Sequence, residues 1–178
     1  MKKIATMFSL AFLVFFTIAC ENEKSLQSYL VESTRKEGFF TGDLPVSSLI
    51  SVKSDVSREI KETMKSIKKI NVAFLKKTDD NIAAYEAEKA ILKNIFKSNN
   101  YKSLGSVKAK GMNVKVYYTG DTSSLDEVIV FGYSGEAGVG IARLLGDKMN
   151  PVKVLEMMNS VNLDGSSLDS FGNIFKGK

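Results

Sequence analysis

The chain has 178 residues, which is enough for one domain with a hydrophobic core, and its formal net charge is a mild +5. It contains a single cysteine and no histidine. These counts exclude an intramolecular disulfide, Ser-His-Asp catalysis and the commonest transition-metal ligand, so the fold must be stable through its core alone. A charge of this size does not by itself indicate a nucleic-acid partner, and we expect none.

The first twenty residues have the order of a secretory signal. Lys2 and Lys3 precede an uncharged apolar run over 4–18, and polar residues begin directly after Cys20. This run is shorter than the ~20 apolar residues that a membrane-spanning helix needs. We therefore interpret residues 1–19 as a signal peptide and expect the chain to be exported.

The residues before Cys20 resemble a lipobox, in which the cysteine becomes the lipid-bearing first residue of the mature chain. Ala19 fits that pattern, whereas Thr17 stands where leucine is usual. The pair Thr17 and Ala19 also suits ordinary signal peptidase, so soluble export and an uncleaved anchor remain alternatives. We expect Cys20 to be lipidated, with residues 20–24 as a tether, because acyl chains gain ~0.8 kcal/mol per buried methylene and hold a protein stably at a membrane.

A single domain is expected over residues 25–161. Its first part begins with a helix over 25–36, whose stripe is Leu26, Tyr29 and Leu30. A short edge strand should follow over 39–45, since glycine and proline interrupt its second half.

The next segment predicts two helices around an inner strand. The first of these helices should be capped by Ser54 or Asp55, with Arg58, Lys61, Lys65 and Lys68 on its solvent face. The strand over 70–75 is apolar on both faces, which places it inside a sheet. Asp79 or Asp80 should cap the helix that follows.

The second half of the domain has strand periodicity. Strands are expected over 101–109 and 112–119, joined at Lys110-Gly111, and then over 127–133 and 138–145. Asn150 followed by Pro151 predicts the start of a last helix that ends near Val161. Residues 162–178 are rich in Gly, Ser and Asp and predict a flexible tail. We therefore predict an α+β fold in which an antiparallel sheet, a meander in its C-terminal half, is packed on one face by helices.

Four stretches together resemble the DUF4252 family: 25–33, 39–45, 126–132 and 143–151. The resemblance spans most of the chain after the tether, and its motifs are structural. It implies a small lipid-anchored envelope protein of Bacteroidetes and flavobacteria, and it supplies no catalytic residues. It also implies that the gene lies near genes for regulators of the extracytoplasmic sigma-factor type. The acidic residues after Cys20 also resemble the export signals of surface lipoproteins in these bacteria, which favours the outer membrane, on its periplasmic or surface side.

Two features could carry chemistry, and each has a simpler structural interpretation. The glycine cluster over 132–140 could cradle a phosphate, but a strand rather than a helix follows it, which favours a hairpin. Ser134 lies in no nucleophile elbow and has no histidine to activate it. The basic face near Lys68 could meet lipid headgroups or an acidic partner, although solvated faces of this kind are common.

Carboxylates are the remaining candidates for catalysis. A hydrolase would need two of them held ~5–10 Å apart in a cleft, and the candidates are Asp79, Asp80, Asp121, Asp126, Glu127, Glu136 and Asp147. Asp79, Asp80 and Asp147 are better explained as cap or turn residues. We predict no catalytic, cofactor or metal site. We expect a lipoprotein that binds an envelope protein and serves as an accessory or signalling module. The alternatives are a binding module for a small apolar or lipid-like ligand and, behind it, a carboxylate hydrolase.

Overall fold

The structure, a computed structural model, describes residues 24–44, 57–109 and 111–160, and the predicted signal peptide, Cys20 and the tail over 162–178 lie outside these ranges. The described elements are, in chain order, α2 (Leu26–Ser33), β1 (Phe39–Leu44), α4 (Arg58–Ser66), β2 (Ile67–Lys76), the 3-10 helix η2 (Asp79–Asn81), α5 (Ile82–Ile95), β3 (Lys102–Ala109), β4 (Met112–Asp121), β5 (Ser124–Ser134), β6 (Gly138–Met149) and α6 (Pro151–Ser160).

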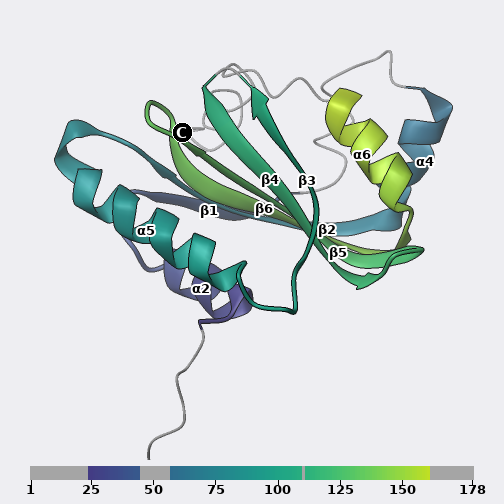
Figure 1. Ribbon diagram of the computed structural model, residues 1–178, viewed down its shortest axis with the longest axis horizontal. Helices are drawn as coiled ribbons and strands as arrows, with labels where there is room; N and C mark the ends of the chain where they lie inside the picture. The colour runs from purple at the N-terminus through teal and green to yellow at the C-terminus, as the bar shows by residue number, and fades with distance from the viewer. Residues whose placement is uncertain (1–23, 45–56, 110, 161–178) are drawn as a thin grey trace, which may run out of the picture.

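The six strands form one sheet in the order β1-β2-β6-β5-β4-β3, and every neighbouring pair is antiparallel (Figure 1). The α+β class, the antiparallel sheet and the C-terminal meander are thereby confirmed. β1 lies at an edge and β2 lies inside the sheet, as their residue patterns predict. The last strand returns between β2 and β5, which makes β6 a central strand.

One face of the sheet is covered by α2 and α5. These helices contribute Tyr29 and Leu92, which are fully buried, to a core that includes Ala73 of β2, Phe131 of β5 and Ile141 of β6. This core contains a cluster of aromatic rings. The ring of Phe96 stacks on that of Tyr117 with centroids 4.4 Å apart and lies 5.5 Å from that of Phe131.

The opposite face carries α4 and α6, which corrects the prediction that the helices all pack on one face. Met64 of α4 and Val154 of α6 are buried in a second core with Ile70, Val128 and Leu144. Along the inner strands, the residues of this second core alternate with those of the core under α2 and α5. Successive residues of a strand point to opposite faces, so the two cores lie on the two sides of the sheet. Helical periodicity indicates which side of a helix is buried but not which face of the sheet receives it.

Helix ends differ in part from the predictions. The N–H groups of Val152 and Lys153 donate to Asn150 Oδ1 at 3.0 and 3.2 Å, which confirms the expected cap of α6. Neither Asp79 nor Asp80 caps α5, because both lie inside η2. The turn is instead held by Asn81, whose Oδ1 accepts from the N–H of Thr78 at 2.8 Å.

Candidate functional site

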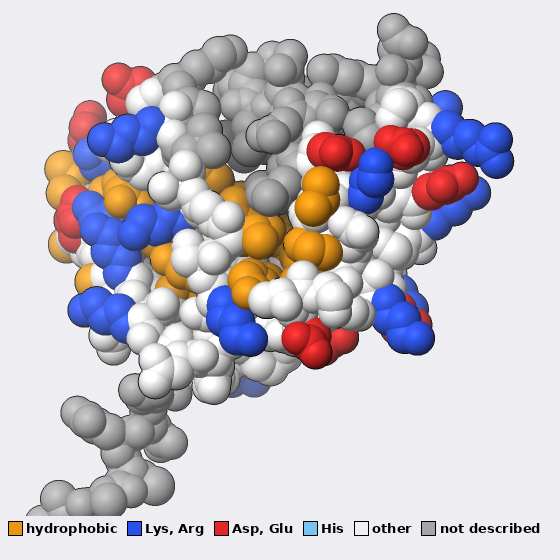
Figure 2. Space-filling model, turned by 45° about the vertical axis from the view of Figure 1, so that its right-hand side comes forward, with side chains coloured by type: hydrophobic (Ala, Val, Ile, Leu, Met, Phe, Trp, Pro, Cys, Tyr) orange, Lys and Arg blue, Asp and Glu red, His pale blue; other side chains and the backbone are white. Residues whose placement is uncertain are grey.

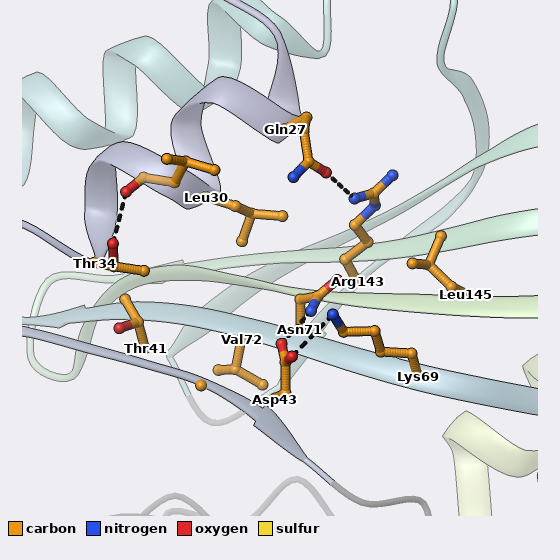
Figure 3. Close-up of a pocket in the computed structure, with 12 residues that line it drawn as sticks. Gln27, Leu30, Thr34, Thr41, Asp43, Lys69, Asn71, Val72, Arg143 and Leu145 are labelled. Carbon is orange, nitrogen blue, oxygen red and sulfur yellow. Dashed lines mark hydrogen bonds and ion pairs between the residues drawn. The ribbon is translucent and has the colours of Figure 1, made fainter.

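An open groove lies between α2 and the strands β1, β2 and β6 (Figure 3). Its volume is about 440 Å³, and we call it the α2 groove. Its lining comes from α2 and the residue after it, from β1 and β2, and from the distant strand β6: Gln27, Leu30, Val31, Thr34, Thr41, Gly42, Asp43, Lys69, Asn71, Val72, Arg143 and Leu145. A space of this size falls within the range of sites that bind small molecules or side chains of a partner.

Arg143 is the central cation of the groove wall. Its Nε donates to Glu127 Oε1 at 2.5 Å, and its Nη1 donates to Gln27 Oε1 at 2.6 Å. The side chain of Arg143 is 16% exposed and that of Glu127 is 11% exposed. Thr119 Oγ1 donates to the other carboxylate oxygen of Glu127 at 3.3 Å. A guanidinium held by two partners in a largely buried position keeps a fixed orientation, and within the described structure its remaining N–H groups have no hydrogen-bond partner.

A second charged group lies beside Arg143 on the neighbouring strands β1 and β2, where Asn71 is the cross-strand partner of Arg143 and Asp43 is that of Asn71. Lys69 Nζ contacts Asp43 Oδ2 at 2.8 Å, and Asn71 Nδ2 donates to Asp43 Oδ1. The hydrogen bond from Lys69 holds the pKa of Asp43 below its usual range, and the bond from Asn71 acts in the same direction. These residues are half-exposed, so this pair contributes little to stability and is open to exchange with a ligand.

The apolar part of the groove comes mainly from α2. The helix buries Leu26, Tyr29 and Leu30 against the sheet. Val31 lies on another side of the helix, and 46% of its surface is exposed. Leu145 of β6 is half-buried on the opposite wall. The groove therefore offers an apolar strip flanked by fixed charges and amides, which suits a ligand with both apolar and hydrogen-bonding parts.

The groove and its surroundings hold few groups that could carry out catalysis among the described residues. The carboxylates nearest to it, Asp43 and Glu127, each bond to a cation, and the hydroxyls that line it belong to Thr34 and Thr41. Over the ranges that the structure covers, no three His, Cys, Asp or Glu side chains come close enough together to hold a metal ion.

Comparison with models of known protein families identifies the family of this chain. The model of the family described as "Domain of unknown function (DUF4252)" matches residues 32–157. The chain belongs to the DUF4252 family. No curated protein and no solved structure matches the chain. The family match covers α2 from Glu32 through most of α6, and thus most of the groove lining.

None of the helices described for this DUF4252 chain is both long enough and apolar enough to cross a membrane.

The residues that sequence reasoning weighed for chemistry are scattered in this DUF4252 chain. The glycine cluster forms the β5–β6 hairpin, and a Cβ on Gly140 would lie 2.5 Å from the carbonyl oxygen of Ala73, so close strand packing explains that glycine. Ser134 Oγ accepts from the N–H of Glu136 at 3.2 Å inside the hairpin turn. Asp147 belongs to β6, rather than to a turn, and lies 3.3 Å from Lys68.

Sequence reasoning missed the groove. A signal for it did exist, because Arg143 shares a strand face with Val139, Ile141 and Leu145, and a cation on an apolar face needs partners. Its partner Glu127 could have been found by the same argument. Gln27 is more than one hundred residues away and could not be paired with Arg143 without the fold.

Proposed function

We propose that this DUF4252 protein is an exported lipoprotein, held at the envelope membrane through an acylated Cys20, that binds a partner protein in the α2 groove without catalysing a reaction. The signal-like sequence over 1–20 supports the export and the anchor. The Arg143 network carries the proposal for the groove, because a fixed guanidinium beside an exposed apolar strip is typical of protein interfaces.

The expected ligand is an exposed segment of an envelope protein with a carboxylate or carbonyl group next to an apolar side chain. The carboxylate or carbonyl would accept from Arg143 or Lys69, and the apolar group would cover the exposed Val31. Both cations lie in the same groove, which supports this arrangement. Exchange of the Lys69–Asp43 pair for a ligand would cost little, since surface ion pairs contribute ~0–1 kcal/mol.

A small apolar or lipid-like ligand is the second candidate. The groove volume of about 440 Å³ favours it. The open, charged walls favour the protein partner instead, because sites for apolar ligands are mostly enclosed and apolar.

The first test places a photo-crosslinking amino acid at Val31 in the chain expressed in intact envelopes. The control places it at Val152, which is 61% exposed on α6. We expect a discrete crosslinked product from Val31 that is absent from Val152 and that weakens when Lys69→Glu reverses a groove charge. The matched variant Lys65→Glu on α4 should leave the product unchanged.

Equal crosslinking from Val31 and Val152, or a Val31 product indifferent to Lys69→Glu, would contradict the groove proposal. The anchor is tested separately by Cys20→Ala. If that variant still fractionates with membranes, Cys20 does not carry the anchor.

A further inference from the structure

A second surface, outside the groove, brings lysines over tyrosine rings. Lys93 Nζ lies 4.8 Å from the centroid of the Tyr133 ring and Lys89 Nζ lies 6.0 Å from it. Lys89 also lies 4.8 Å, and Lys77 5.3 Å, from the centroid of the Tyr85 ring. We call Lys77, Lys89, Lys93, Tyr85 and Tyr133 the lysine–tyrosine surface. Figure 2 shows Lys and Arg side chains beside hydrophobic ones at its left, on the side where α5 lies.

The positive charge of this surface is only partly neutralised. Glu86 contacts Lys89 at 2.5 Å, whereas Lys77 and Lys93 form no ion pair with any described residue. Lys89 and Lys93 are four residues apart on one helix, where like charges repel, yet both are directed at the same ring. The ring quadrupole offsets part of that repulsion, and an external anion would offset the rest.

The basic face near α4 is also only partly paired with carboxylates. Arg58 lies 3.4 Å from Glu62, and Lys68 lies 3.3 Å from Asp147. Its neighbour Lys153 on α6 contacts Glu59 at 2.8 Å. Lys61 and Lys65 of the same basic face form no ion pair with a described residue, so both surfaces keep unpaired lysines. What distinguishes the lysine–tyrosine surface is that its lysines lie over aromatic rings.

The short interval along the chain between Cys20 and α2 bears on what the anion is. Lys24 follows Cys20 by four residues, and an extended chain spans that interval with at most about 14 Å. α5 lies beside α2, because Lys36 Nζ, just after α2, contacts Glu88 Oε1 of α5 at 2.5 Å (Figure 1). An acyl group on Cys20 would therefore hold the helical layer of α2 and α5 near the bilayer.

We infer that the lysine–tyrosine surface binds the phosphate headgroups of an anionic phospholipid bilayer, an inference that rests on the proposed lipid anchor at Cys20. Lysines that reach such a surface bind it electrostatically. The rings beneath them belong to the core, where Tyr85 is buried, and they hold the lysine side chains in place. The contact sets the orientation of the anchored domain and leaves the face with α4 and α6 directed away from the lipid.

The test uses the full lipidated chain in vesicles of phosphatidylcholine alone and in vesicles that also contain phosphatidylglycerol. Acylation of each lysine by a water-soluble reagent is followed by mass spectrometry. We expect Lys93 and Lys77 to react about fivefold more slowly on the anionic vesicles, and high salt to abolish the difference. Lys61 and Lys65 on α4 are the internal controls and should react at the same rate on both.

A paired variant sharpens the result. Lys89→Gln with Lys93→Gln should remove the protection of Lys77, whereas Lys61→Gln with Lys65→Gln should keep it. Equal rates for Lys93 on the two vesicles overturn the inference, with no variant needed. Protection that arises in intact envelopes but not on anionic vesicles also overturns it, in favour of an acidic protein.

Failure of the anchor would look different. A chain that does not float with neutral vesicles has no lipid on Cys20, and this observation is independent of the comparison between neutral and anionic lipid.

Discussion

The two faces of the sheet carry different kinds of core. The face under α4 and α6 is mainly aliphatic, with residues such as Leu125, Val128 and Met149 fully buried. The face under α2 and α5 combines stacked aromatic rings with buried polar groups, among them Ser33 and Glu88. The aliphatic face can be explained by the burial of apolar area. The aromatic and polar face requires specific partners, because buried polar groups are costly when they have none.

The proposed binding surfaces and the mainly aliphatic core lie on different faces of the sheet. Both surfaces with a proposed ligand, the α2 groove and the lysine–tyrosine surface, lie on the face of α2 and α5. The ion pairs near α4 and α6 lie at the protein surface, where water screens the charges. We therefore expect polar substitutions to have larger effects on the face of α2 and α5. For the single substitutions that break an ion pair, a matched residue on the other face serves as the control.

The largest effect should come from Arg143→Met. It removes the cation from Glu127, whose side chain is 11% exposed, and leaves a buried carboxylate without its charge partner. We expect a loss of about 3 kcal/mol in the free energy of unfolding, measured by urea denaturation. The control on the other face is Lys68→Met, which breaks the exposed Lys68–Asp147 pair and should cost less than about 0.5 kcal/mol.

The double variant Arg143→Met with Glu127→Met completes this cycle. Replacing both members of a buried pair by apolar side chains is often neutral, so we expect most of the lost stability to return. A double variant that is less stable than Arg143→Met alone would show that other contacts hold the Glu127 carboxylate. The stability of the polar face would then not depend on the Arg143–Glu127 pair.

The sequence predicted the strands, the inner position of β2 and the cap of α6, because period-two apolar patterns and an Asn-Pro helix start are local signals. It did not predict which face each helix covers, since that depends on tertiary packing. The β2 pattern of apolar residues on both faces did imply two covered faces. The partnership of Arg143 with Gln27 was out of reach because it joins residues from the two ends of the domain. Local patterns thus predict the elements, and the groove exists only in their assembly.

An intermediate effect is expected for Lys36→Met. Lys36 Nζ is 2.5 Å from Glu88 Oε1, and the side chain of Glu88 is 9% exposed. The substitution leaves that carboxylate uncompensated, and we expect a loss of about 1–2 kcal/mol in the free energy of unfolding. Lys153→Met on the other face breaks the contact with exposed Glu59 and should cost less than about 0.5 kcal/mol. Equal losses for the two variants would remove the proposed difference between the faces.

The smallest effect at neutral pH should come from Tyr29→Phe. Tyr29 is fully buried, and its hydroxyl, like Oε2 of Glu88, has no hydrogen-bond partner within the described structure. Removing an unpaired buried hydroxyl breaks no hydrogen bond and removes a desolvation cost. We therefore expect the free energy of unfolding to stay the same or to rise by up to about 1 kcal/mol. Ser33→Ala is the matched control, because Ser33 Oγ donates to the carbonyl oxygen of Tyr29 at 2.7 Å and its loss should destabilise by about 1 kcal/mol.

The same variant should have a larger effect in alkali. Burial raises the pKa of Tyr29 far above its usual range, and the charge of Glu88 raises it further. The unfolded chain releases this proton near pH 10 while the folded chain retains it, so the stabilisation is complete below about pH 10 and is lost as the pH rises through the window above it. The wild type should lose up to about 1.4 kcal/mol per pH unit from this one group in that window, and Tyr29→Phe should not. Because burial also raises the pKa of Tyr101 in both proteins, only the difference between their urea-denaturation curves reports on Tyr29. Parallel curves from pH 9 to 11 would mean that Tyr29 ionises in the folded chain as readily as in the unfolded one, and the core under α2 would then be open to water rather than closed around an unpaired hydroxyl.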